Sequence, residues 1–334
     1  MLRIFKGTGP GVILLIIIAL AVLWISAFIE PKLPSPAIYE LRPMPLYAVL
    51  KILVGQNPIP GAIFSFMILS FILILMVHFN TTVFFINERT FLPAILYLLL
   101  CSLFPQYQVL NPVLPAVVFL MLAIMRILDS YRKPGIAYNF FDAGLMIGIG
   151  SLFYANLIWF GLLVFIGIAL LRTGNIKEIA VSILGLATPF LITFGLYYVL
   201  GKDLALFRED ILENLYGYSA VYDFSRLTLI ATILIGLTII VSISYLFMGI
   251  NSKKIKARKT FSILLWGFFM SLILYFALPS MSVEIIWIAA VPASYFLAHY
   301  FVFVRKKLIP EIIFSALFLL VLILHGVYIY TQVT

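Results

Sequence analysis

Long apolar runs, separated by short polar stretches, recur along almost the whole chain. About 20 apolar residues in a helix cross the hydrocarbon core of a bilayer, and a chain in lipid must satisfy its own backbone hydrogen bonds. The runs therefore predict an all-α polytopic bundle with about eleven transmembrane spans. The predicted spans are 10–29, 61–79, 91–104, 112–128, 141–154, 156–171, 178–200, 227–250, 261–278, 285–304 and 308–330.

Two neighbouring segments, 141–154 and 156–171, are short for full crossings, and the alternative is one long broken helix over 141–171. Lysine and arginine gather in cytoplasmic loops, so their distribution distinguishes the two interpretations. A single helix would place the basic clusters 253–259 and 305–307 outside, which favours eleven spans with the N-terminus inside and the C-terminus outside. All but six of the 22 basic residues then lie inside, the six being Lys32, Arg42, Lys51, Lys202, Arg208 and Arg226.

Composition excludes a soluble domain of any size. The chain is 64% apolar and 10% charged, whereas about a quarter of the residues of a soluble domain are charged. The net charge of +9 reflects the basic loops and not a nucleic-acid patch. We therefore expect residues 1–334 to form a single membrane domain in the cell inner membrane, without a nucleic-acid partner.

The first apolar stretch and the one cysteine each have a simple interpretation. Arg3 and Lys6 precede a stretch over 12–29 that is longer than the apolar region of a signal peptide, so we expect an uncleaved first span. Cys101 lies in an apolar run and is the sole cysteine, which excludes an intramolecular disulfide and a thiolate metal cluster.

Two outer loops are long enough to hold structure. The first, 30–60, is rich in proline and contains an apolar segment, 46–54, that suits a short helix lying in the membrane interface. The second, 201–226, alternates charged and apolar residues and predicts an amphipathic surface helix. The apolar residues on one face of that helix are Leu204, Phe207, Ile211 and Leu215.

Ionisable residues within spans are costly, and each has a structural interpretation beside a functional one. Asp142 is either a carboxylate at the start of its helix or a buried partner of Arg126 or Arg132. Glu311 follows Pro310 and suits the first turn of the last span. Three histidines lack a second ligand at helical spacing, so we expect no metal site, and a proton relay is the functional alternative for each. They are His78, His299 and His325.

Several acids lie on the predicted outer face: Glu30, Glu40, Asp203, Glu209, Asp210, Glu213, Asp223 and Glu284. Either they gather there because positive charge is excluded from that side, or one of them is a general base or metal ligand acting on a lipid-linked substrate. The chain contains no phosphate-binding glycine loop, no HExxH and no GxSxG, and no cofactor is indicated. Glycines at 144, 148, 150, 161 and 167 suit close packing of helices.

The stretch from about 80 to 200 resembles an uncharacterised family of polytopic inner-membrane proteins found in the Bacteroidota. The resemblance rests on the strings NERTFLPAILY at 87–97, SLFP at 102–105, FDAG at 141–144, GSLFY at 150–154, RTGNIKE at 172–178 and LGLATPF at 184–190. It implies a membrane location and a helical fold, and no particular activity.

The order of parts also resembles the GT-C class of membrane glycosyltransferases, which take sugars from polyprenyl-phosphate donors. The resemblance implies that an acid of the first outer loop, Glu30 or Glu40, is the catalytic base, and that Arg42, Lys202 or Arg208 contacts phosphate from the outer side. The class usually carries Asp-containing motifs in that loop, and this chain has none there.

The resemblance favours a protein of envelope biogenesis, either a glycosyltransferase or a relative without the chemistry. Its partners would be membrane lipids and a polyprenyl-phosphate-linked substrate. A transporter or flippase and a structural subunit that binds other membrane proteins are the alternatives.

Overall fold

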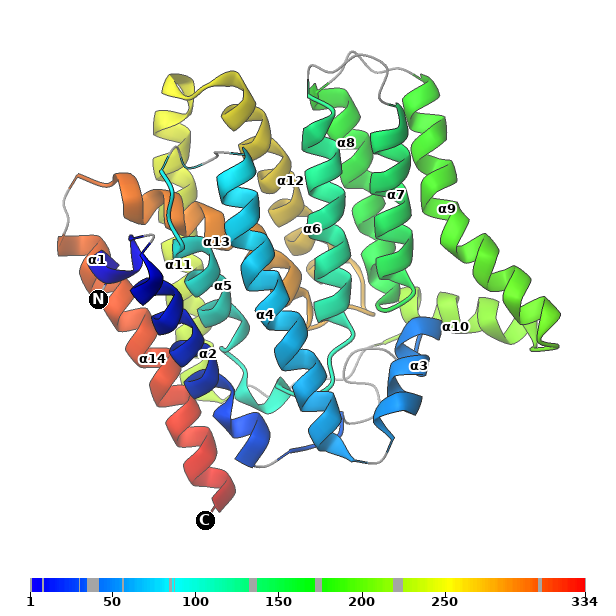
Figure 1. The fold of residues 1–334 in the computed structure, drawn as a ribbon, viewed down its shortest axis with the longest axis horizontal. Coiled ribbons are helices and arrows are strands. Elements are labelled where there is room, and N and C mark those ends of the chain that lie inside the picture. Colours follow the sequence, from blue (N-terminus) through cyan, green and yellow to red (C-terminus); the bar gives the residue numbers. More distant parts are fainter. Residues whose placement is uncertain are drawn as a thin grey trace.

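The structure is a computed structural model, and it describes every residue except 1, 8, 30, 35–41, 56, 84–85, 87, 132–136, 172–175, 219–224, 306–307 and 334. The described residues form helices and connecting segments, without a strand among them (Figure 1). In chain order the helices are α1 (Leu2–Phe5), α2 (Pro10–Ile29), α3 (Pro45–Val54), α4 (Pro58–Val83), α5 (Leu92–Cys101), η1 (Pro105–Tyr107), α6 (Val113–Asp129), α7 (Ala137–Ser151), η2 (Ala155–Phe160), α8 (Gly161–Leu171), α9 (Ile176–Val199), α10 (Leu204–Tyr216), α11 (Arg226–Gly249), η3 (Ile250–Ser252), α12 (Ile255–Ala277), α13 (Ile285–Phe303) and α14 (Leu308–Val333).

Each predicted span coincides with a helix, but the helices differ in length. Within the described residues, seven helices are long and apolar enough to cross a membrane: α2, α4, α9 and α11 to α14. Of the other four, α5, α7 and α8 are shorter than a full crossing needs, and α6, with 17 residues, is at the lower limit. The chain therefore has the helices of a multi-pass membrane protein, while eleven crossings and the sidedness of the termini stay predictions.

The break between α7 and α8 confirms that 141–171 is not one helix. The chain turns after Ser151 and continues through η2, so that α7 and α8 lie side by side (Figure 1). Asp142 lies in the second turn of α7, so its expected place at the helix start was wrong. Its carboxylate instead lies 3.6 Å from Nε of Arg126 on α6, which confirms the pairing with Arg126, but both side chains are partly exposed and the pair is not buried as predicted.

Glu311 does lie in the first turn of α14, as predicted. Its Oε1 accepts a hydrogen bond from the backbone N–H of Leu2 at 3.1 Å. This acid therefore connects the start of the chain to the start of the last helix.

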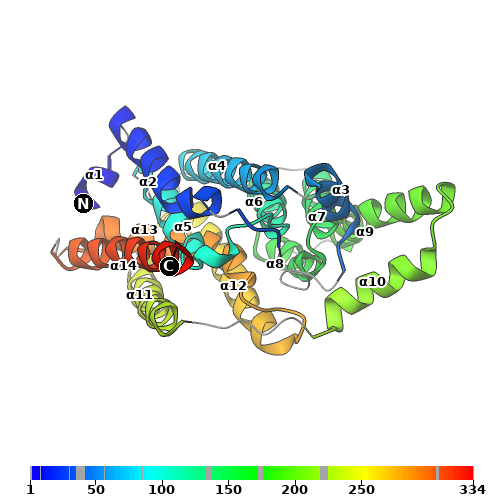
Figure 2. The ribbon, with the colours of Figure 1, turned by 90° about the horizontal axis from the view of Figure 1, so that it is seen from below.

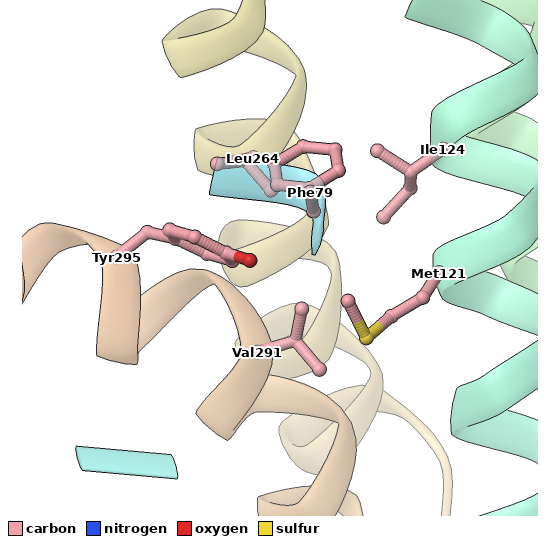
Figure 3. Close-up of a pocket in the computed structure, with 6 residues that line it drawn as sticks. All are labelled: Phe79, Met121, Ile124, Leu264, Val291 and Tyr295. Carbon is pink, nitrogen blue, oxygen red and sulfur yellow. The ribbon is translucent and has the colours of Figure 1, made fainter. Parts of the chain in front are cut away.

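The centre of the bundle is built from α5 and α13. All ten residues of α5 are buried, and α13 packs against α5, α11 and α12 (Figures 1 and 2). Tyr295 of α13 donates a hydrogen bond to the carbonyl of Met76 at 2.8 Å. Around its ring, side chains from α4, α6, α12 and α13 converge and leave a void too small for one water molecule (Figure 3).

Because α5 is only ten residues long, non-helical backbone flanks it inside the bundle. Before α5, the amide of Asn80 on α4 donates to the carbonyls of Glu88 and Thr90 at 3.4 and 3.3 Å. The Thr90 hydroxyl in turn accepts the N–H of Leu92 at 3.2 Å. A carbonyl without a partner would be costly in hydrocarbon, so these polar side chains are structural.

Polar side chains also satisfy the backbone after α5. His325 of α14 contacts the carbonyl of Ser102 through Nε2 at 2.9 Å. Ser65 of α4 donates to the carbonyl of Val109 at 2.9 Å, and Tyr47 of α3 donates to that of Leu110 at 3.3 Å. His325 therefore has a structural role, because it donates a hydrogen bond to the backbone of a neighbouring segment.

Helices α7 and α9 approach so closely that each needs glycine at the crossing. A Cβ on Gly144 would overlap the carbonyl of Ser182, and one on Gly185 would overlap the carbonyl of Phe141. Close packing of small residues is a main source of helix association in membranes. The predicted packing role of Gly144 is confirmed.

Replacing Gly185 by leucine should force α7 and α9 apart and lower the free energy of unfolding by about 2 kcal/mol or more. Thermal unfolding of the detergent-purified protein measures this. Gly195→Leu is the matched control on the same helix, because a Cβ there meets no atom within 4 Å. Equal losses in the two variants would contradict the role of the crossing.

His325→Leu should destabilise the protein by about 1–3 kcal/mol, since it leaves the buried Ser102 carbonyl without its donor. His325→Gln keeps an N–H donor and should restore part of that stability in the same unfolding assay. If glutamine were no better than leucine, the hydrogen bond would not be the reason for histidine here.

Candidate functional site

Two short helices, α3 and α10, lie on the side of the bundle where α2 and α14 end (Figures 1 and 2). Both were predicted as helices of the outer loops, and both are confirmed as helices. On α3, Ile52 and Leu53 are 79% and 75% exposed, which suits a helix whose apolar face enters the membrane interface. On α10, Phe207 and Leu215 are buried, as the spacing of its apolar residues predicted.

The sequence also determines where α10 begins. Asp203 accepts hydrogen bonds from the N–H groups of Ala205 and Leu206 at 2.8 and 3.3 Å, as an N-cap residue does. This outer acid therefore has a structural role.

Arg42 fastens the first outer loop to α10. Its Nε donates to Glu213 at 2.7 Å, and its Nη1 lies 3.3 Å from Asp210. Asn214 completes the contact by accepting from the Arg42 N–H at 3.0 Å and donating to the Arg42 carbonyl at 2.7 Å. We call this group, Arg42 with Asp210, Glu213 and Asn214, the Arg42 latch.

The electrostatics of the latch follow from its geometry. The hydrogen bond and charge of Glu213 raise the pKa of the Arg42 guanidinium. Burial raises the pKa of Asp210, and the positive charge of Arg42 opposes that rise. The guanidinium is already occupied by two carboxylates, so it would contact a phosphate only by releasing one of them.

The latch lies over the break between α7 and α8. The N–H of Leu46 donates to the carbonyl of Leu152 at 3.0 Å. Beneath it, Met44 of the first loop and Leu215 of α10 share a small apolar cluster with Ala155. The first outer loop, α10 and the α7–α8 turn therefore form one packed unit.

The other two predicted phosphate contacts lie apart from the latch. The ammonium of Lys202 lies 4.8 Å from the centre of the Tyr197 ring, before α10 begins, and Arg208 is exposed on α10. Lys202 and Glu213 are separated by most of that helix, about 15 Å. Glu30 and Glu40, the predicted catalytic acids, lie outside the described residues, as does Asp223.

Glu284 is a fully buried acid on the same side. Its Oε1 accepts hydrogen bonds from the Tyr154 hydroxyl at 3.2 Å and from the Ser282 N–H at 2.9 Å. Nearby, Ser280 donates to the carbonyl of Leu215 at 2.7 Å.

No group of three metal-ligating side chains occurs in the part of the chain that the structure describes.

An open hollow of about 450 Å³ lies beside α3. The sequence interpretation missed it, because its walls come from segments far apart in the chain. One cation, Lys51, lines it, and its ammonium lies 5.7 Å from the centre of the Tyr47 ring. The lining residues are Leu33, Pro34, Lys51, Ile52, Val54, Gly55 and Leu110.

The model of a family of unknown function, DUF6427, matches residues 43–333. The chain belongs to this DUF6427 family. The match begins one residue after Arg42 and covers the other three members of the latch, both surface helices and every spanning helix except α2. No curated protein and no solved structure matches the chain.

Asn214→Ala should detach the first outer loop from α10, because it removes both hydrogen bonds to the Arg42 backbone. Two partly buried hydrogen bonds correspond to about 2 kcal/mol of stability. Hydrogen–deuterium exchange should rise at 42–46 and over the second half of α10. Arg208→Ala is the control, and the same rise in that variant would overturn the latch.

Proposed function

We propose that this DUF6427 protein binds a lipid with an anionic headgroup at the outer face of the inner membrane, as a protein of envelope biogenesis. The observation that carries the proposal is the hollow beside α3. It is formed by the first outer loop, it contains the cation Lys51, and it adjoins apolar residues that suit the membrane interface. A lipid with an anionic headgroup and an apolar chain matches both features, because the headgroup would pair with the cation and the chain with the apolar residues.

The volume of the hollow is consistent with this ligand. Pockets for small ligands have volumes of about 300–1,000 Å³, and the hollow falls within that range. Lys51 supplies a point charge for a phosphate, and the end of α3 adds the backbone of Gly55 to the wall. Ile52 faces both the hollow and the surroundings, so a lipid chain has a direct path from bilayer to pocket.

Within this proposal the predicted site residues have different roles. Glu30 precedes the lining residues Leu33 and Pro34 closely in the sequence and is the first choice as general base, with Glu40 the second. Arg42 positions the loop through the latch. Lys202 and Arg208 are contacts for the more distant part of a long headgroup, such as a sugar phosphate.

The short helix α5 favours transport as a second candidate function. Discontinuous helices at the midplane of a bilayer are typical of secondary transporters. In the described part of the bundle, however, the voids next to α13 have volumes of about 30 Å³ or less. A transported solute would need a conformation in which these helices separate, so binding at the outer face is the better supported proposal.

Lys51→Glu should weaken binding of polyprenyl phosphate to the nanodisc-embedded protein by about tenfold or more, because it replaces a charge-assisted contact by repulsion. Native mass spectrometry across a series of lipid concentrations gives the affinity. Lys256→Glu, an exposed lysine at the start of α12, should leave it unchanged. If the Lys51→Glu variant bound polyprenyl phosphate as tightly as the unaltered protein, the proposal would be wrong.

Assays on the same preparation distinguish an enzyme from a protein that only binds lipid. Glu30→Gln and Glu40→Gln should keep lipid binding, and in an enzyme one of them should lose sugar transfer from a polyprenyl-phosphate sugar. Glu209→Gln, an exposed acid of α10, is the matched control. Binding without transfer in the unaltered protein would assign a non-catalytic role.

A further inference from the structure

A second and larger groove runs between α2 and α4, with α5 as part of its wall. Its volume is about 620 Å³. Its walls are mainly aliphatic along most of its length, with Leu20 of α2, Leu73 of α4 and Ala94 of α5 among the lining residues. This groove is separate from the hollow beside α3.

The groove opens toward the outside of the bundle. Ile17 and Ile74, on its two sides, are 55% and 65% exposed, while Leu20 and Leu73 are 4% and 5% exposed. Both α2 and α4 are candidate membrane spans, so the medium at this opening is hydrocarbon. Water is therefore an unfavourable occupant, and a lipid chain is the one available from the surroundings.

Polar groups gather at one end of the groove. His78 and Thr81 of α4 line it there, and Nε2 of His78 lies 3.3 Å from the hydroxyl of Thr82. Arg89 is exposed and stands two residues before Phe91, which also lines the groove. The groove thus has a long apolar part and a polar end, with a cation two residues away in sequence from a lining residue, as a phospholipid has a chain and a phosphate.

The polar end lies far from the hollow beside α3. His78 is twenty residues from Pro58, the start of α4, which corresponds to about 30 Å along the helix. That distance is about the thickness of the hydrocarbon core, so the polar end of the groove and the hollow lie at opposite sides of the core.

We propose that the groove between α2 and α4 is a binding site for a phospholipid of the leaflet on the side of the basic loops. One acyl chain lies between the two helices against α5. The phosphate lies at the polar end, where His78 and Arg89 supply donors. Lipid around the protein is as apolar as the groove, so shape and the phosphate contact determine the affinity.

Filling the groove tests the proposal. Purified protein should retain one phospholipid in native mass spectrometry, and Ile17→Trp with Ile74→Trp should lower the retained fraction about tenfold. Leu14→Trp with Met67→Trp is the matched control, since both residues are exposed on the same helices but do not line the groove. The control should fold and retain lipid like the unaltered protein.

A headgroup variant tests the phosphate contact with little change in the shape of the groove. Arg89→Gln with His78→Leu should lower retention of phospholipid, but not of diacylglycerol added in its place, whereas Lys256→Gln should change neither. The proposal is overturned if the unaltered protein retains no lipid, if the filled variant retains as much, or if the headgroup variant keeps its phospholipid.

Discussion

Backbone groups inside a bilayer need hydrogen-bond partners within the protein, and much of this structure follows from how the segment around α5 meets that constraint. A full-length helix satisfies itself, but α5 covers only Leu92–Cys101. The carbonyls before and after it are therefore satisfied by side chains of other helices, such as Asn80 and His325. Burial of all of α5 against α13 keeps its ends away from lipid, and the long helices surround that pair.

A second interruption, between α7 and α8, shapes the side of the bundle where α3 and α10 lie. There the turn is covered by protein, because the first outer loop and α10 pack over it through Leu46, Met44 and Leu215. The Arg42 latch then fixes these two surface segments to each other. The hollow beside α3 is lined by other residues of the same first outer loop, together with Leu110.

The hollow and the groove between α2 and α4 have complementary features. The hollow combines a lysine with the edge of an interfacial helix, whereas the groove is a long apolar channel with polar groups at one end. Helix α4 connects the two regions. Its start, Pro58, follows α3 beside the hollow, and His78, near its end, lines the groove.

The sequence by itself determined the helices, because their signals are local. Apolar runs placed every spanning helix, and a 3.6-residue spacing placed Phe207 and Leu215 on the buried face of α10. Glycines marked the close crossing of α7 and α9. These features depend on residues a few positions apart, and the physics that produces them acts within one helix.

Tertiary structure alone decided which polar residues are structural. Asn80, His325 and Arg42 have partners 8 to 223 positions away, and no local signal shows that these groups meet. For the same reason the sequence did not show the Arg42 latch or the lining of the hollow and of the groove. Hydrogen-bond pairing and cavity shape depend on how helices pack in three dimensions, whereas the helices themselves depend on the hydrophobicity of neighbouring residues.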